Sequence, residues 1–282
     1  MEAGYVTRTM TRDECALAVE WAAREDWNPG LHDAASFHAA DPQGFFVGVL
    51  DGEPVASISV VKYDPGFAFL GLYIVRPEWR GRGFGHALWK HGMDSAAGRQ
   101  VGLDGVPAQQ PNYRKSGFEL AWCNARYEGR GGASAPEDAQ LVDLARVPFD
   151  TVKDYDSPFF PADRGSFLRA WLAQPDAAGV AWLEDGRLQG YGVIRQCRQG
   201  WKIGPLFADG ERIAEGLYAA LAARAAGGEP VYLDVPEANY DAVALAQRHH
   251  MHKVFDTARM YTGRPPAVPM HRLYGITTFE LG

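Results

Sequence analysis

The stretch LYIVRPEWRGRGFGHAL, residues 72–88, decides the fold of this 282-residue chain. Three glycines and two arginines fall between Arg80 and Gly85, after an apolar run and before residues 88–96, which show helical spacing. A glycine-rich loop at this place presents several backbone N–H groups at a helix N-terminus, where the helix dipole also favours an anion. The stretch predicts a phosphate-binding loop, and a tight surface turn with solvated arginines is the alternative.

Two familiar phosphate loops do not fit this stretch. The chain lacks the GxxxxGK[ST] pattern of nucleotide triphosphatases. Its glycines also do not follow GxGxxG within a βαβ unit that continues to an acidic residue at the ribose distance. Both classes of nucleotide-binding protein are therefore excluded.

The segments around the loop have the pattern of strands. Residues 44–63 predict two strands that turn at Asp51-Gly52, a strong hairpin signal. Residues 66–75 predict a buried third strand before the loop, and residues 99–106 a short strand after the helix. The first half of the chain therefore combines strands and helices.

The same order recurs after residues 128–140, a stretch rich in Gly, Ala, Ser and Pro that we interpret as a linker. Residues 179–197 predict a second hairpin, turning at Asp185-Gly186. A strand, a helix and another strand are expected at residues 200–208, 213–224 and 229–236. Two short segments repeat one pattern: Val101-x-Leu103-Asp104-x-Val106-Pro107 and Val231-x-Leu233-Asp234-Val235-Pro236. The chain is predicted to be a duplication of two α+β units, each of roughly 130 residues.

Composition limits the kinds of partner. The net charge of -7 and the pI near 5.6 argue against nucleic acid and acidic membranes, and suit a cationic small molecule. No apolar run reaches the ~18 residues of a membrane span and the first residues do not resemble a signal peptide, so a cytoplasmic location is expected. The three cysteines are far apart and predict neither disulfides nor a zinc site. His249, His250 and His252 lack a nearby acid or cysteine, so no metal is expected there.

The loop resembles motif A of the GNAT superfamily of acyl-CoA N-acyltransferases, [Q/R]-x-x-G-x-[G/A], matched by Arg80, Gly83 and Gly85. NYRKSGFE, residues 112–119, is similar to the Tyr-x-x-x-Gly-Phe segment of that family, with Tyr113 in register. The resemblance covers roughly residues 5–127, a span of ordinary domain size. It implies a twisted, mostly antiparallel sheet, split by a β-bulge, with acetyl-CoA or another acyl-CoA in the opening.

The resemblance also implies roles for the residues that match. Backbone amides from Arg82 to His86 would hold the pyrophosphate, and the strand residues Ile74 and Val75 would pair with the pantetheine arm. Arg80 and Arg82 would add charge, or lie solvated. The residues expected at the cofactor are Ile74, Val75, Arg80, Gly81, Arg82, Gly83, Phe84, Gly85, His86 and Asn112.

The family's usual general acid is matched by Tyr113, whose phenol suits a departing thiolate; a packing role is the alternative. The strand at residues 66–75 carries no glutamate, so the base must come from elsewhere or water must relay the proton. Residues 21–34 resemble the variable acceptor-binding helices of the family. Glu25 and His32 are the candidates for catalysis there, and Asp26 and Trp27 for binding a cationic amine.

The second unit departs from the family pattern. Residues 207–217 have acids in place of the arginines and no G-x-G, and residues 244–255 lack a tyrosine at the matching position. This layout resembles a tandem-GNAT subgroup with a degenerate second domain. The predicted division is a catalytic domain at 1–128, a linker at 129–140 and a degenerate GNAT-like domain at 141–282. Residues 255–263 and 276–282 are candidates to line the acceptor pocket.

The activity that follows is transfer of an acetyl group from acetyl-CoA to an amine of a small molecule, by direct attack in a ternary complex. No cysteine or serine lies in a nucleophile setting, so no covalent intermediate is expected. Two alternatives stay open: a noncatalytic acyl-CoA sensor, and a transferase for protein lysines or N-termini. The sequence predicts neither the acceptor nor the oligomeric state.

Overall fold

The computed structural model describes residues 4–282 and contains two α+β units. The helices of the first unit are α1 (Arg12–Arg24), α2 (Asp33–Ala40), α3 (Phe84–Ser95) and α4 (Gln110–Lys115). Its strands are β1 (Tyr5–Thr9), β2 (Phe45–Leu50), β3 (Glu53–Lys62), β4 (Phe67–Val75), β5 (Gln100–Gly105) and β6 (Phe118–Arg130).

The second unit repeats this order with small changes. Its helices are α5 (Phe149–Asp156), α6 (Gly165–Leu172), α7 (Glu211–Ala222) and α8 (Tyr240–Arg248). Its strands are β7 (Leu141–Asp143), β8 (Ala177–Glu184), β9 (Arg187–Gln196), β10 (Trp201–Ala208), β11 (Pro230–Pro236), β12 (His252–Thr262) and β13 (Leu273–Gly275).

The α+β class, both hairpins and the strands flanking the glycine loop are confirmed. The hairpin turns at Asp51-Gly52 and Asp185-Gly186 have the positive φ angles that a two-residue turn needs. Strand β6 continues to Arg130, two residues into the segment 129–140 that was interpreted as a linker.

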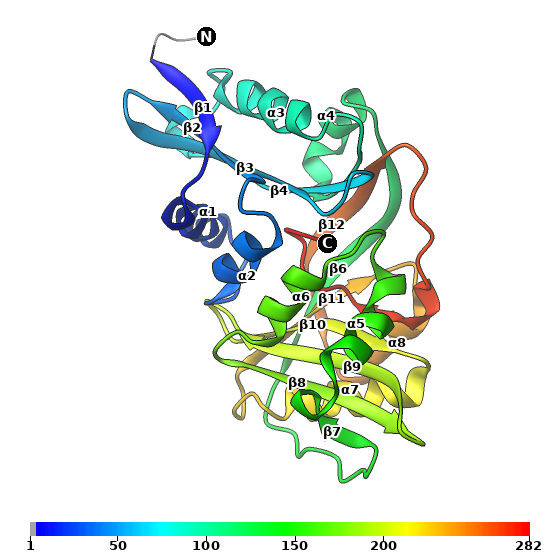
Figure 1. Ribbon diagram of the computed structural model, residues 1–282. Coiled ribbons are helices and arrows are strands. Elements are labelled where there is room, and N and C mark those ends of the chain that lie inside the picture. Colours follow the sequence, from blue (N-terminus) through cyan, green and yellow to red (C-terminus); the bar gives the residue numbers. More distant parts are fainter. Residues whose placement is uncertain (1–3) are drawn as a thin grey trace.

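The two units share one sheet, which the sequence did not predict. The strand order is β1-β2-β3-β4-β5-β12-β6-β11-β10-β9-β8-β7, and all neighbours are antiparallel except the pairs β4/β5 and β10/β11. Strand β12 of the second unit pairs with β5, and β6 of the first unit pairs with β11. Each unit therefore completes the sheet of the other with its last long strand. These two strands, β6 and β12, lie side by side as an antiparallel pair between the two halves of the sheet (Figure 1).

Two buried ion pairs join the exchanged strands to the other unit. Arg126 on β6 binds Asp234 on β11 through two hydrogen bonds of 2.6 and 2.8 Å. Arg259 on β12 binds Asp104 on β5 through two hydrogen bonds of 2.8 and 2.6 Å. The two aspartates are the repeated Leu-Asp positions of the sequence, so the duplication places one acid in each unit to receive an arginine from the other.

The helices divide into inner and outer sets. In Figure 1, α1, α2, α5 and α6 lie between the two halves of the sheet, whereas α3 and α7 lie at opposite ends of the molecule. The inner helices contribute to one hydrophobic core that joins both units; Phe37 of α2 stacks on Trp171 of α6 with ring centroids 6.4 Å apart. The units therefore pack as one body.

Both parallel strand pairs split partway along their length. Strand β4 pairs with β5 only from Phe67 to Leu70, and β10 pairs with β11 only from Trp201 to Ile203. Beyond the first split the edge of β4 is open, because Leu72 has a φ of 46° and shifts the register against β3. The β-bulge expected in the first unit is therefore present.

The second split is filled by the chain itself. Strand β13 pairs with β10 at Leu206 and Phe207, and the N–H of Ile276 donates to the carbonyl oxygen of Asp234 on β11 at 2.9 Å. These contacts occupy the edges of β10 and β11 in the second unit. The corresponding edges of β4 and β5 remain open in the first unit. The equivalent opening of the second unit is therefore closed by residues 273–276.

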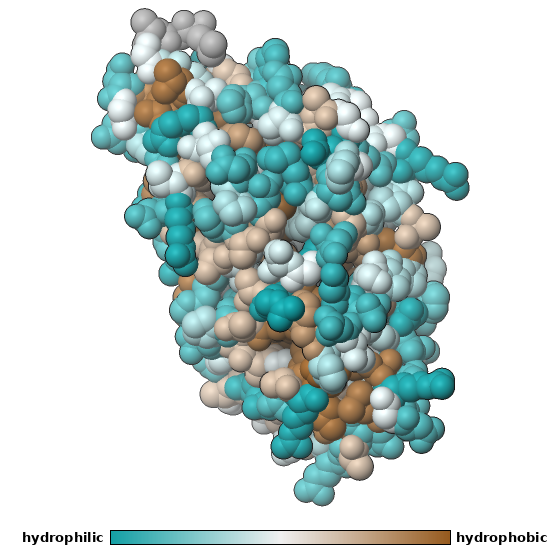
Figure 2. All heavy atoms as spheres, in the orientation of Figure 1, coloured by the Kyte–Doolittle hydropathy of each residue, from teal (hydrophilic) through white to brown (hydrophobic). Residues whose placement is uncertain are grey.

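The face of the molecule shown in Figure 2 is mainly hydrophilic, with apolar residues gathered chiefly at its lower end. None of the helices in the described part of the chain combines the length and the apolar character needed to cross a membrane.

Candidate active site

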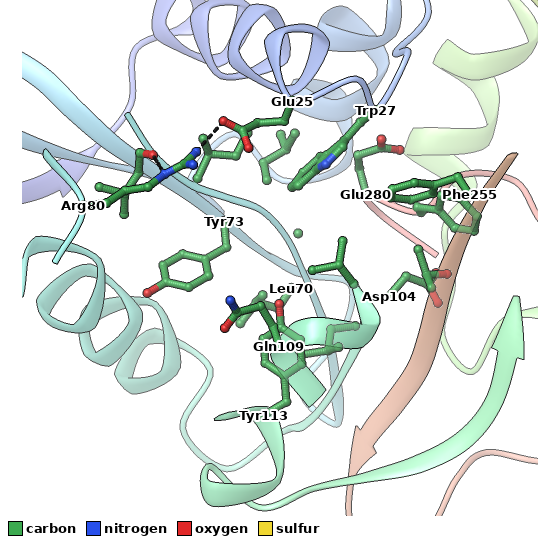
Figure 3. Close-up of a pocket in the computed structure, with 18 residues that line it drawn as sticks. Glu25, Trp27, Leu70, Tyr73, Arg80, Asp104, Gln109, Tyr113, Phe255 and Glu280 are labelled. Carbon is green, nitrogen blue, oxygen red and sulfur yellow. Dashed lines mark hydrogen bonds and ion pairs between the residues drawn. The ribbon is translucent and has the colours of Figure 1, made fainter. Parts of the chain in front are cut away.

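A cavity of about 380 Å³ occupies the split between β4 and β5. Figure 3 shows Arg80 and Tyr73 at one end of it, Phe255 and Glu280 at the other, and Tyr113 below. Residues of the first unit line most of the cavity, and Phe255, Thr257, Phe279 and Glu280 come from the second. The cavity is therefore built jointly by the two units.

The glycine loop lies next to the Arg80 end of this cavity. Gly81 and Gly83 have φ angles of 76° and 86°, which favour glycine, and no atom would meet a Cβ within 4 Å at either. Gly85 serves packing instead, since its Cβ would come within 2.8 Å of the hydroxyl of Tyr73 and of Val75 Cγ2. The loop thus leaves open space before α3, whose first-turn N–H groups have no partner within the helix.

Gly83 is the N-cap of α3, so Phe84, Gly85 and His86 form its first turn. Their N–H groups are three of the backbone donors expected at the pyrophosphate. Arg82 lies over the ring of Trp79, with its guanidinium carbon 4.7 Å from the ring centroid. An anion at this helix end would meet donors, a positive dipole end and open space, and so the loop fits a pyrophosphate.

The side chain of Arg80 has two partners within the first unit. Its Nε donates to the carbonyl oxygen of Val75 at 2.8 Å, and its Nη2 lies 2.5 Å from Glu25 Oε1. The residue follows the short 3₁₀ turn Pro77–Trp79, and its side chain is directed back to β4 and α1 rather than to the loop amides. Arg80 therefore joins β4 to the C-terminal end of α1.

Tyr113 lies on α4 and lines the cavity. Its ring stacks on Trp89 with centroids 5.7 Å apart and contacts Phe118 edge to face at 6.4 Å. Burial, helped by the neighbouring Tyr73, raises the pKa of the Tyr113 phenol to about 12. The phenol is thus held in its protonated form, which is the form a general acid needs.

The other residues predicted at the site divide into two groups. Ile74, Val75, Glu25 and Trp27 line the cavity. Arg126 fixes the backbone of Trp27 by donating to its carbonyl oxygen at 2.6 Å. The structure therefore brings Glu25 and Trp27 to the same cavity as Tyr113.

His32, Asp26 and Asn112 lie outside this lining. His32 Nε2 is 3.0 Å from Asp176 Oδ2 at the junction of the units, because the chain turns away from the cavity after Trp27. Asp26 is exposed, and Asn112 donates to Gln109 Oε1 at 2.8 Å. The structure does not bring these three side chains together with Tyr113.

Sequence reasoning missed Asp104 and Gln109 as cavity residues. Segments 255–263 and 276–282 were expected to line it, and each contributes two residues. A second repeat, Ala125-Arg126 and Ala258-Arg259, was the available signal for the exchanged strands. No local pattern, however, relates residue 280 to β4.

Comparison with known proteins gives two family matches and a relative over the whole chain. The model described as "Acetyltransferase (GNAT) family" matches residues 11–118, and that described as "Acetyltransferase (GNAT) domain" matches residues 152–275. A protein named holothin acyltransferase, from Pseudoalteromonas sp. (strain SANK 73390), is 30% identical over 99% of this chain and 95% of its own length.

The chain belongs to the GNAT acyltransferase family. Both units are GNAT domains, and the second has lost the glycine loop that the first retains. The expected family, the tandem arrangement and the class of enzyme, an acyltransferase, are therefore confirmed.

Solved structures share the whole architecture. A putative acetyltransferase from Pyrococcus horikoshii superposes with a TM-score of 0.84 at 24% identity, covering 100% of this chain and 97% of that one. A tandem GNAT protein from the clavulanic acid biosynthesis pathway has a TM-score of 0.63 at 15% identity, covering 93% of this chain and all of that one. At these identities the likeness concerns the fold alone.

One residue of the histidine cluster, His249, has side-chain contacts within the second unit. His249 Nε2 contacts Glu215 Oε1 and its ring packs on Tyr218. Among residues 4–282 no group of three or more His, Cys, Asp or Glu side chains is arranged to hold a metal ion.

Proposed function

We propose that this protein is an N-acetyltransferase that moves the acetyl group of acetyl-CoA to a primary amine of a small molecule, by direct attack in a ternary complex. The observation that carries the proposal is the cavity that runs from Arg80, beside the glycine loop, to the second unit. Its loop end suits the pyrophosphate, and the open edge of β4 suits the amide-rich pantetheine arm. The opposite end is left for the acceptor.

The walls of that opposite end support a small acceptor. Phe255, Phe279 and Glu280 of the second unit line it, so the second unit stands where an acceptor protein would need an open groove. Trp27 faces them from the first unit. We infer that the acceptor is a compact amine, because a polar head would meet a carboxylate while its body contacts aromatic rings.

The reaction assigned to this site uses two proton transfers. The amine nitrogen attacks the thioester carbonyl and gives up one proton to a base or to water, the C–S bond breaks, and Tyr113 gives its phenolic proton to the departing sulfur. Three of the backbone N–H groups proposed to hold the pyrophosphate belong to Phe84, Gly85 and His86, and Ile74 and Val75 would align the pantetheine arm. Preorganised donors of this kind hold the thioester in place for attack.

Thiol release measured with the full-length chain, acetyl-CoA and a panel of amines tests the proposal. The panel contains a polyamine, an amino acid, an aminoglycoside, an aryl amine, and holothin because of the name of the relative. We expect acceptor-dependent thiol release with at least one amine, and a product heavier by one acetyl group. Cofactor binding without such release would favour an acyl-CoA sensor, and acetylation of peptides alone would favour a protein acetyltransferase.

A further inference from the structure

Three carboxylates line the cavity, and two of them are engaged by arginines. Glu25 is paired with Arg80 at 2.5 Å. Asp104 is held through both oxygens by Arg259, and it is completely buried. The arginines occupy acceptor positions on these two carboxylates, which leaves fewer of their lone pairs for an incoming amine.

Glu280 is the third carboxylate, and its setting is different. Its side chain accepts a hydrogen bond from Thr278 Oγ1, and within residues 4–282 no Lys, Arg or His forms an ion pair with it. The residue is only 4% exposed. A buried carboxylate without an ion-pair partner is costly, so the ammonium group of an incoming amine would stabilise this site.

The backbone holds Glu280 in the split beside β4. A Cβ at Gly71 would lie 2.1 Å from the carbonyl oxygen of Glu280, so this contact requires glycine. Tyr63 of the first unit donates to the carbonyl oxygen of the next residue, Leu281, at 3.0 Å. The segment is therefore docked on the first unit, at the end of the cavity opposite Arg80.

We propose that Glu280 is the proton acceptor for the incoming amine. This inference rests on the proposed function and deepens it, since it names the base that the strand before the glycine loop lacks. As the N–C bond forms and the C–S bond breaks, the amine proton passes to the Glu280 carboxylate and the Tyr113 proton passes to sulfur. Solvent returns the proton from Glu280 to Tyr113 before the next turnover, so the cycle is balanced.

The second unit acquires a clear role from this assignment. Its own split is closed by β13, and the chain that leaves β13 carries Phe279 and Glu280 into the split of the first unit. One GNAT domain therefore keeps the cofactor loop, and the other supplies the base.

The test compares Glu280→Gln with the wild-type chain, using the best amine of the panel. We expect kcat/KM for the amine to fall about 100-fold or more near neutral pH, the usual range for loss of a general base. The Kd of acetyl-CoA, measured by calorimetry, should stay within about twofold, since the cofactor would be held elsewhere. Glu280→Asp should recover part of the loss because it restores a carboxylate.

The pH profile distinguishes proton transfer from a structural role. The loss in Glu280→Gln should shrink at alkaline pH, where more of the amine is already neutral. The charged groups whose pKa values respond to Glu280 are Asp104, Arg126 and Arg195. Both arginines stay charged over the range tested, because their pKa values are raised, and Asp104 would keep its pairing with Arg259 in both proteins, so these groups would not produce this difference.

Glu237→Gln is the matched control, because Glu237 belongs to the same unit and pairs with Lys253 outside the cavity lining. It should leave all kinetic values unchanged. Unchanged kcat/KM in Glu280→Gln, or a parallel loss of acetyl-CoA affinity, would overturn the assignment of Glu280 alone. Absence of acceptor-dependent turnover by the wild-type chain would instead contradict the proposed function and this assignment together.

Discussion

Tyr113 shows how a single side chain is adapted to its proposed role by packing. The ring stacks on Trp89 and contacts Phe118 edge to face. Burial raises the pKa of its phenol to about 12. A phenol with an ordinary pKa near 10 would begin to lose its proton in mildly alkaline solution. In this site the proton is retained over a wider range of pH.

Replacement of Tyr113 by Phe should lower kcat about 100-fold, because the departing thiolate loses its proton donor. A raised pKa means that the acid form persists up to the raised value, so wild-type kcat should show no loss from phenol ionisation below about pH 11. Steady-state rates from pH 6 to 10 check both statements. Tyr73→Phe, a change at a neighbouring cavity tyrosine, is the comparison; equal kcat in Tyr113→Phe and wild type would remove Tyr113 from the mechanism.

At the scale of elements, the two units differ most at the helix that follows the split. Gly83 caps α3 with a φ of 86°, whereas Gly210 caps α7 with extended backbone at -178°. Neither Cβ would meet an atom within 4 Å. The two glycines therefore have the same space and different backbone conformations, and only the first requires glycine.

Acetyl-CoA should bind once per chain, because β13 closes the second split. Gly83→Ala should weaken that binding about tenfold, since a left-handed conformation costs an L-residue roughly 1–2 kcal/mol and the loop would shift. Gly210→Ala should leave it unchanged. Titration calorimetry gives the stoichiometry and both affinities; two sites per chain, or equal effects of the two substitutions, would contradict this account.

At the scale of the whole molecule, exchange of β6 and β12 makes the two units interdependent. Arg126 and Asp234 lie on strands from different units, and their side chains are 3% and 2% exposed. Burial alone would raise the pKa of Asp234, but the charge and hydrogen bonds of Arg126 outweigh it and hold that pKa below 3.8. Loss of either partner would leave a buried charge unpaired.

Asp234→Asn should lower the free energy of unfolding by about 3–5 kcal/mol, as expected when one member of a buried pair is removed. Because the folded pKa of Asp234 is depressed, the pair stabilises the wild type above pH 3.8 and less as pH falls below it. Denaturant unfolding at pH 7 and pH 3 should therefore show the two proteins converging in acid.

Two comparisons sharpen this measurement. The double replacement Arg126→Met with Asp234→Leu should recover most of the loss, because no charge stays buried without a partner. Asp94→Asn, at the exposed pair with Lys90, should have no measurable effect. A loss in Asp234→Asn no larger than that in Asp94→Asn would show that the exchanged strands do not depend on this pair.

The sequence by itself determined the local elements and showed which unit carries the glycine loop. Asp51-Gly52 and Asp185-Gly186 predicted the hairpins, and the glycines from Gly81 to Gly85 predicted the loop before α3. These signals are readable because turn chemistry and periodicity depend on residues close together in the chain. The missing loop in the second unit was visible for the same reason.

Only the tertiary structure decided how the units join and what faces the cavity. The partner of Arg259 is Asp104, 155 residues away, and Glu280 meets Gly71 through a backbone contact that no sequence spacing encodes. A repeated motif shows that two strands are alike, but it does not say which sheet each one enters. That choice depends on burial and pairing between distant segments, which exist only in the folded chain.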